Sequence, residues 1–291
     1  MTSRRFTRRF ALLLLCAGLS TPSFAQQNPI EVAASNAIIA DLVRQIGGEH
    51  VRVRPIVAAN ADPHDFEPTP NDARQVAQAK LVVINGLGFE PWADRFLRSA
   101  NFRGERLVAS RGLKALSVRG SIDPHAWQDV ENMRIYVANI RDALIKIDPA
   151  GETFYQRNAA NYQRQLDGLH GEIKRGFAAI PAEQRKVVTS HDAFNYFGDA
   201  YGVVFLAPQG VSSHAQPSAQ DMARLIRQIR DQHIRAIFFE QGLPQRVLQQ
   251  ITAESGAKIG GTLYADTLDN KVTTYIDMMR HNARTIVAAL R

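Results

Sequence analysis

Short apolar runs rich in β-branched residues alternate along most of the chain with longer stretches of helical spacing. We predict that these runs are strands, and they cover residues 30–34, 51–57, 80–85, 186–189, 203–206 and 236–239. The stretches between them place apolar residues three and four apart, which is the spacing of one helix face. Strands that alternate with helices in this way predict parallel βαβ units, with one block of them in each half of the chain.

The middle of the chain, from about residue 127 to residue 179, has helical spacing and no strand pattern. One helix is predicted to end before Asp148-Pro149, because proline disfavours helical backbone in the preceding residue. A second is predicted over 150–180, where apolar side chains recur at Tyr155, Ala159, Tyr162, Leu166, Leu169, Ile173 and Phe177. A helix of that length spans about 45 Å. We expect it to be a rigid spine that joins two lobes.

The predicted fold is α/β, with two lobes that each contain a parallel sheet. The expected segments are a signal peptide over 1–25, an N-terminal lobe over 26–149, the spine helix over 150–180 and a C-terminal lobe over 181–291. Parallel sheets bind ligands outside the carboxyl ends of their strands, and two-lobed proteins bind them between the lobes. We therefore expect a functional site in the interlobe cleft.

The first 25 residues have the pattern of an export signal. Four arginines precede a short apolar run over 10–19, which is too short to cross a membrane because a span needs about 20 residues. The small residues Ser23 and Ala25 predict cleavage near Ala25 and a periplasmic protein. Leu15 stands before Cys16 where a lipid-attachment signal wants a small residue, so lipidation is disfavoured. The arginine pairs could also form a twin-arginine signal, so the sequence does not decide which pathway exports the protein.

Composition and charge exclude several classes of function. The chain of 291 residues is 45% hydrophobic and 22% charged, as globular proteins are. Loss of residues 1–25 removes four arginines and no acid, so the net charge falls from +7 to +3. This charge is too small to indicate nucleic-acid binding, and no nucleic-acid-binding motif is present. The single cysteine excludes a disulfide framework, and a metal would have to be bound through His, Asp and Glu.

Three of the eight histidines lie in loops after strands or at helix starts, where α/β folds place binding residues. His64 and His125 each follow an Asp-Pro pair, and His191 follows the predicted strand 186–189. A neighbouring carboxylate can bond one imidazole nitrogen and leave the other available to a metal. The separations of 61 and 66 residues mean that a shared site forms only when the lobes fold around it. From these residues alone, the three histidines could form a metal site or could only stabilise their loops.

Five motifs in order resemble those of the metal-binding solute receptors of ABC importers, the zinc and manganese class. They are DPHDFEPTP at 62–70, NGLGFEPW at 85–92, DPHAW at 123–127, SHDAFNYF at 190–197 and LYADTLD at 263–269. The resemblance covers essentially the whole chain after the signal. It implies a monomeric receptor that delivers its cargo to a membrane permease. It also implies four metal ligands between the lobes, namely His64, His125, His191 and Asp266.

The implied ligands bear on the metal. Three neutral imidazoles and one carboxylate suit four-coordinate Zn²⁺, whereas Mn²⁺ prefers more oxygen ligands. Manganese receptors of this class tend to carry a carboxylate at the position of His191. We therefore expect Zn²⁺ as the transported ion, with Mn²⁺ as the alternative if Asp266 binds through both oxygens. Because protonated imidazole cannot bind a metal, affinity is expected to weaken below about pH 6.

Other polar residues give weaker signals. The stretch 110–123 lacks the histidine- and acid-rich loop that many zinc receptors of this class carry. His214 is a candidate accessory ligand, although a surface residue is the better interpretation. Asn60 and Glu67 are candidates for orienting the ligands. The remaining histidines are interpreted as exposed or capping residues, and they are His50, His170, His233 and His281.

Two other function classes remain. A zinc hydrolase needs an open coordination position for water and a nearby base, for which Asp65, Glu67 or Asp192 are the candidates. A fourth ligand from Asp266 would close that position, and no hydrolase motif or nucleotide-binding loop is present. We therefore expect no enzymatic activity and ATP hydrolysis by a partner. The other class is an adhesin-like exported protein.

For a receptor, the spine helix predicts small movements of the lobes, with rearrangement of the loops around His125 or Asp266.

Overall fold

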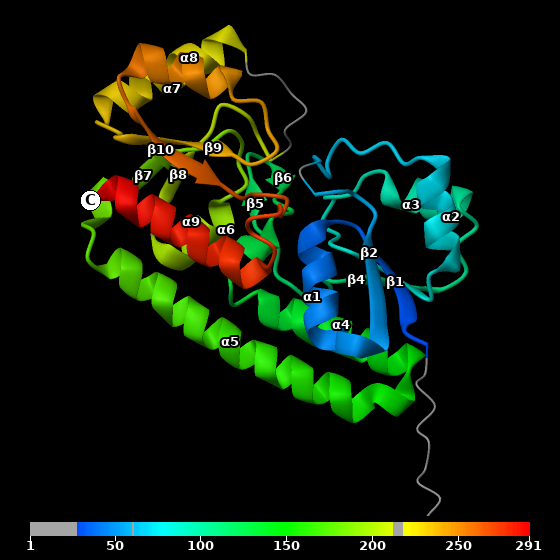
Figure 1. Cartoon of the computed structure of the whole chain (residues 1–291). Coiled ribbons are helices and arrows are strands. Elements are labelled where there is room, and N and C mark those ends of the chain that lie inside the picture. Colours follow the sequence, from blue (N-terminus) through cyan, green and yellow to red (C-terminus); the bar gives the residue numbers. More distant parts are fainter. Residues whose placement is uncertain (1–27, 60, 212–217) are drawn as a thin grey trace, which may run out of the picture.

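The computed structural model describes residues 28–59, 61–211 and 218–291. The predicted signal peptide with Cys16 and Ala25 lies outside the described residues, as do Asn60 and His214. Two α/β lobes stand side by side on one long helix, α5 (Glu152–Ala178), which passes beneath both of them (Figure 1). The predicted fold class is confirmed.

The N-terminal lobe contains a parallel sheet of four strands in the order β2-β1-β3-β4. Its strands are β1 (Ile30–Ala34), β2 (Val51–Pro55), β3 (Leu81–Ile84) and β4 (Glu105–Val108). Its helices are α1 (Ala37–Gly47), α2 (Pro70–Gln78), α3 (Ala93–Ser99) and α4 (Met133–Ile147). The prediction missed β4, because Glu105 and Arg106 interrupt the apolar pattern of this short edge strand.

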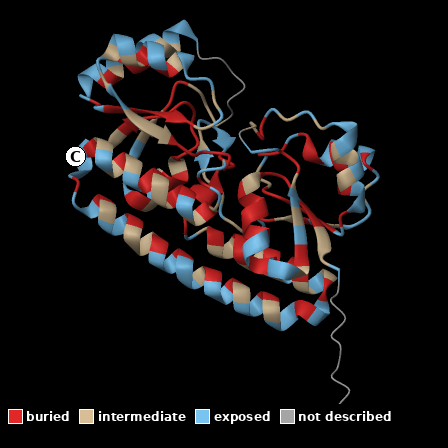
Figure 2. Ribbon diagram, viewed as in Figure 1, coloured by how far each residue is buried: buried red, intermediate tan, exposed pale blue. Residues whose placement is uncertain are grey.

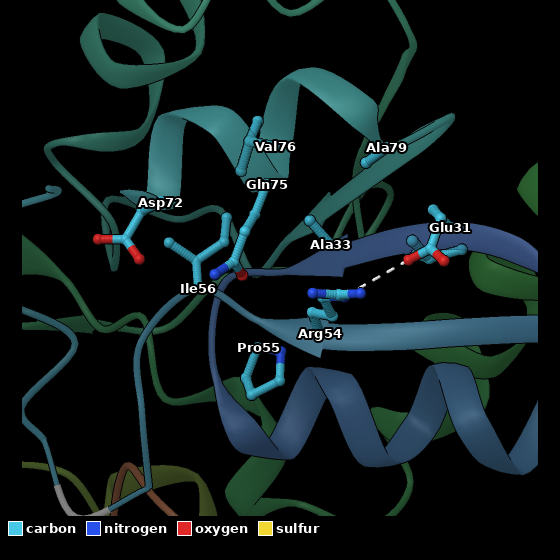
Figure 3. Close-up of a pocket in the computed structure, with 10 residues that line it drawn as sticks. Glu31, Ala33, Arg54, Pro55, Ile56, Asp72, Gln75, Val76 and Ala79 are labelled. Carbon is cyan, nitrogen blue, oxygen red and sulfur yellow. Dashed lines mark ion pairs between the residues drawn. The ribbon is translucent and has the colours of Figure 1, made fainter. Parts of the chain in front are cut away.

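The opposite edge of this sheet is charged. Glu31 of β1 pairs with Arg52 and Arg54 of the edge strand β2, at 2.7 and 3.5 Å. Figure 3 shows the Arg54 pair beside a hollow under α2 that has a volume of only about 10 Å³. Such a hollow holds one water molecule at most. The charges therefore protect an exposed sheet edge from pairing with another chain, and they do not form a ligand site.

The C-terminal lobe repeats the parallel arrangement in the order β10-β9-β7-β8. Its strands are β7 (Lys186–Val188), β8 (Val204–Leu206), β9 (Ala236–Glu240) and β10 (Lys258–Leu263). Its helices are α6 (Asn195–Tyr201), α7 (Ala219–Asp231), α8 (Arg246–Ser255) and α9 (Tyr275–Leu290). The prediction missed β10, because Gly260 and Gly261 break its apolar pattern where its register with β9 shifts.

A short antiparallel hairpin of β5 (Ser117–Val118) and β6 (Ser121–Ile122) precedes the loop of His125. In Figure 1 it lies between the two lobes. No helix in the described parts of the chain is long and apolar enough to cross a membrane.

One apolar core runs through both lobes. It joins the inner face of the first sheet to α1, α4 and α5, and continues to α9 and the second sheet. The seven apolar positions predicted for the spine are all buried. Figure 2 shows exposed and intermediate residues along the outer side of α5, away from the lobes. This helix contacts α1 and α4 of one lobe and α6 and α9 of the other. Wide separation of the lobes would therefore expose a large apolar area to water.

Candidate metal centre

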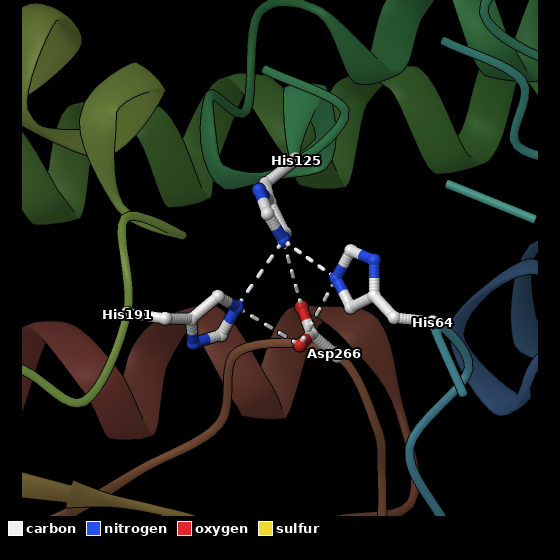
Figure 4. A group of neighbouring side chains, drawn as sticks. All are labelled: His64, His125, His191 and Asp266. Carbon is white, nitrogen blue, oxygen red and sulfur yellow. Dashed lines mark hydrogen bonds and ion pairs between the residues drawn. The ribbon is translucent and has the colours of Figure 1, made fainter. Parts of the chain in front are cut away.

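Four loops bring the four predicted ligands to one place between the lobes (Figure 4). His64 lies between β2 and α2, His125 follows β6, His191 follows β7 and Asp266 follows β10. One ligand atom of each residue lies within 4.8 Å of the others. His125 and His191 are fully buried, while His64 and Asp266 are 5% and 6% exposed. These two residues therefore mark the side of the site nearest to solvent.

The inward-facing atoms are three imidazole nitrogens and two carboxylate oxygens. The Nε2 atom of His125 lies 3.2 Å from Nε2 of His64 and 3.4 Å from Nε2 of His191. Asp266 places Oδ1 at 3.3 Å from Nε2 of His125, and Oδ2 at 3.2 Å from Nε2 of His191. Oδ2 is also 3.7 Å from Nε2 of His64. Both carboxylate oxygens therefore face the common centre.

The second Asp-Pro-His motif orients His125 as expected. Asp123 Oδ1 accepts hydrogen bonds from Nδ1 of His125 at 2.7 Å and from its backbone nitrogen at 2.9 Å. Burial acts to raise the pKa of Asp123, but the hydrogen bonds and charge of His125 outweigh it and lower that pKa. Because an ionised carboxylate only accepts, Nδ1 carries a proton, and a neutral ring then points the Nε2 lone pair at the centre. In the first motif, Asp62 accepts from the backbone nitrogen of His64 at 2.9 Å.

His191 is oriented by Glu240, a residue that the sequence analysis missed. Glu240 Oε2 lies 2.5 Å from Nδ1 of His191, and Oε1 accepts from the backbone nitrogens of Ser190 and His191 at 2.6 and 3.1 Å. Glu240 ends β9, which is paired with β7, and it is 2% exposed. The signal for it was an acidic residue at the end of a strand whose other residues are apolar, Ala236–Phe239.

The charges of the site shift two pKa values in opposite directions. Burial acts to lower the pKa of His191, but the charges of Glu240 and Asp266 outweigh it and raise that pKa well above its usual value. Burial acts to raise the pKa of Asp266, but the charges of His191 and His125 outweigh it and lower that pKa. In the absence of a metal, the site therefore holds a proton on His191 and a negative charge on Asp266.

Phe89 forms the apolar wall of the site. Its ring meets the rings of His64 and His125 edge-on, at centroid distances of 4.6 and 5.8 Å, and it is fully buried. The loop that carries it contains Leu87 in the left-handed region, with φ of 56°. The buried Glu90 carboxylate holds this loop by accepting from two backbone nitrogens at 2.7 and 3.0 Å. The NGLGFEPW motif thus shapes one wall of the candidate metal centre.

The remaining candidates lie outside the cluster. Asp65 and Glu67 are exposed, and Asp192 turns its carboxylate to Arg119, at 3.2 Å. Among the described residues, the cluster has no other histidine. His281 lies inside α9 and contacts the carbonyl of Thr262 in β10 at 2.9 Å, so it is neither exposed nor a capping residue.

Comparisons with known proteins show the family to which the chain is similar. The family model described as "Zinc-uptake complex component A periplasmic" matches residues 32–289. The manganese-binding lipoprotein MntA of Halalkalibacterium halodurans is 32% identical over 280 residues, covering 94% of this chain and 93% of that protein. The iron-binding protein YfeA of Yersinia pestis is 33% identical over 293 residues, covering 95% and 93%. The periplasmic zinc binding protein TroA from Treponema pallidum superposes with a TM-score of 0.86 at 31% identity, over 90% of this chain and 99% of that chain.

Proposed function

Since the chain belongs to the family of periplasmic zinc-uptake components, which are metal-binding solute receptors of ABC importers and not enzymes, we propose that it captures one divalent metal ion between its lobes. The proposed ligands are His64, His125, His191 and Asp266. The receptor acts as a periplasmic monomer and delivers the ion to a membrane permease.

The observation that carries this proposal is the convergence of the Nε2 atoms. With Nδ1 of His125 and His191 bonded to carboxylates, the two rings turn their Nε2 atoms toward the same centre, 3.4 Å apart. An ion that displaces the His191 proton would be met by the Nε2 lone pairs of both rings. A tetrahedral ion with bonds of about 2.0–2.1 Å separates its ligand atoms by about 3.3–3.4 Å. The spacing of the site therefore fits a bound metal ion.

Zinc is the proposed cargo. Three imidazoles and one carboxylate form a donor set that zinc favours, and zinc binds more tightly than manganese to nearly any such set. The inward orientation of both Asp266 oxygens supports manganese as the second candidate, because it provides five donor atoms. A relative named as manganese-binding shares 32% of its residues with this chain, which also supports that candidate.

Metal analysis of the exported protein tests the proposal. The protein is purified without an affinity tag or chelator, and its metals are measured by mass spectrometry. We expect one zinc ion per chain, retained by Asp231→Ala, which alters an exposed carboxylate, and lost by Asp266→Ala. One manganese ion per chain would instead support the second candidate. A metal-free protein that binds neither ion on titration would contradict the proposed function.

A further inference from the structure

The loop of His125 is bonded mainly to the C-terminal lobe, although it precedes α4 of the N-terminal lobe in the sequence. Tyr196 accepts from the backbone nitrogen of Leu116 at 2.9 Å and donates to the carbonyl of Asp123 at 3.1 Å. Asn195 donates to the Asp123 carboxylate at 2.9 Å. His125 is therefore braced to the lobe that carries His191 and Asp266.

The end of this loop bonds to the residue that precedes Asp266. The carbonyl of Ala265 accepts one hydrogen bond from Nε1 of Trp127 at 2.8 Å and another from Nε2 of Gln128 at 3.0 Å. The same Gln128 nitrogen lies 3.4 Å from the carbonyl of Tyr264. Two side chains that follow His125 by two and three residues thus hold the backbone next to Asp266, and they link the loops of two proposed ligands.

The buried side chain of Gln128 lowers the stability of the fold. Its side chain is fully buried, and its Oε1 atom has no hydrogen-bond partner among the described residues. A buried acceptor without a partner destabilises a protein, and an apolar side chain of the same shape would avoid that loss. Trp127 already bonds to the Ala265 carbonyl, so the carbonyl does not need Gln128 to be satisfied. An amide at a position where it destabilises the fold points to a role beyond stability.

We infer that Gln128 is a positioning residue for Asp266. Its amide holds the Asp266 backbone at a set distance from His125, so that the carboxylate meets the ion without reorganising. The inference rests on the proposed function, because it assumes that both residues bind the metal. The consequence is kinetic. Without the amide the ligands remain, but Asp266 moves more freely and the ion dissociates faster.

The test is Gln128→Met, which keeps the shape of the side chain and removes both polar atoms. The matched control is Gln165→Met, at an exposed position of α5. Three quantities are measured on the full chain: the melting temperature without metal, the rate of Zn²⁺ release into excess chelator, and the visible absorption spectrum of the Co²⁺ form. We expect an unchanged or higher melting temperature and release about three- to tenfold faster, as expected for loss of one hydrogen bond. We also expect changed Co²⁺ bands, which report the carboxylate coordination.

The outcomes separate this inference from the function on which it rests. If the wild-type protein binds neither Zn²⁺ nor Co²⁺, this result contradicts the proposed function. Wild-type protein that binds both, with release rate and spectrum unchanged in Gln128→Met, would overturn the inference alone. A lower melting temperature with unchanged release would also overturn it, because Gln128 would then serve folding only. If the methionine variant does not fold, Gln128→Asn gives the same comparison, since it keeps an amide that is too short to reach Ala265.

Discussion

His191 Nδ1 and Glu240 Oε2 lie 2.5 Å apart, with both side chains buried. This contact joins the ends of two paired strands, β7 and β9, and it holds the ring so that Nε2 faces the proposed metal centre. A carboxylate behind a metal-binding imidazole makes the imidazole a stronger ligand. If His191 binds the ion as proposed, Glu240 acts on the metal through it.

Replacing Glu240 by glutamine should weaken metal binding. The variant keeps the shape of the side chain but removes its charge, so we expect affinity to fall by about 10- to 100-fold, as outer partners of metal ligands typically contribute. Competition titration against a zinc-binding dye measures this. Glu254→Gln, at an exposed position of α8, is the control and should bind as the wild type does. Equal affinities in the two variants would show that Glu240 has no influence on the metal.

Zinc affinity should depend on pH, and the dependence should begin higher than ordinary imidazole chemistry suggests. Because Glu240 and Asp266 raise the pKa of His191 in the metal-free protein, a proton competes with the ion already above about pH 6.5. We expect affinity to fall steadily as the pH is lowered from about 8.5 to about 5.5, with protons released on binding. Isothermal titration in buffers of different ionisation enthalpy counts these protons. Affinity that stays constant across this range would contradict three histidine ligands.

The metal-free protein should show the opposite trend in stability. A raised pKa of His191 means that its charged form stabilises the fold. This contribution is fully present below the unfolded pKa of about 6.5 and is lost as the pH rises through the raised folded value. The melting temperature of the metal-free protein should therefore fall with rising pH, while the stabilisation gained from added zinc grows. In His191→Gln, the part of this fall in melting temperature that His191 causes should disappear. If the melting temperature of the metal-free variant falls with pH as steeply as that of the wild type, other groups cause the dependence.

Removing a ligand should cost more than removing a group behind it. We expect His64→Ala, His125→Ala and His191→Ala each to lose more than the about 100-fold in affinity that outer partners contribute. His233→Ala changes an exposed histidine and should bind normally. Equilibrium dialysis with radioactive zinc measures all four. Wild-type affinity in any of the first three would exclude that residue from the site.

The parts that could be predicted from sequence are those that local patterns encode. The spine helix follows from seven apolar positions spaced three or four apart, and all seven are buried. The role of Asp123 beside His125 follows from their adjacency in one motif. Glu240 could not be predicted in this way, because it is 49 residues from His191 and meets it only through the pairing of β7 with β9. The attachment of the His125 loop to the C-terminal lobe likewise depends on contacts between segments that are about 70 and 140 residues apart.

The apolar core that α5 shares with both lobes also bears on recognition by the permease. We expect a receptor whose halves share one interior to keep nearly the same outline with and without its cargo. The permease then cannot distinguish a loaded receptor from an empty one by a closure of the two lobes. We expect it to sense the rim of the site instead, where His64 and Asp266 come closest to solvent.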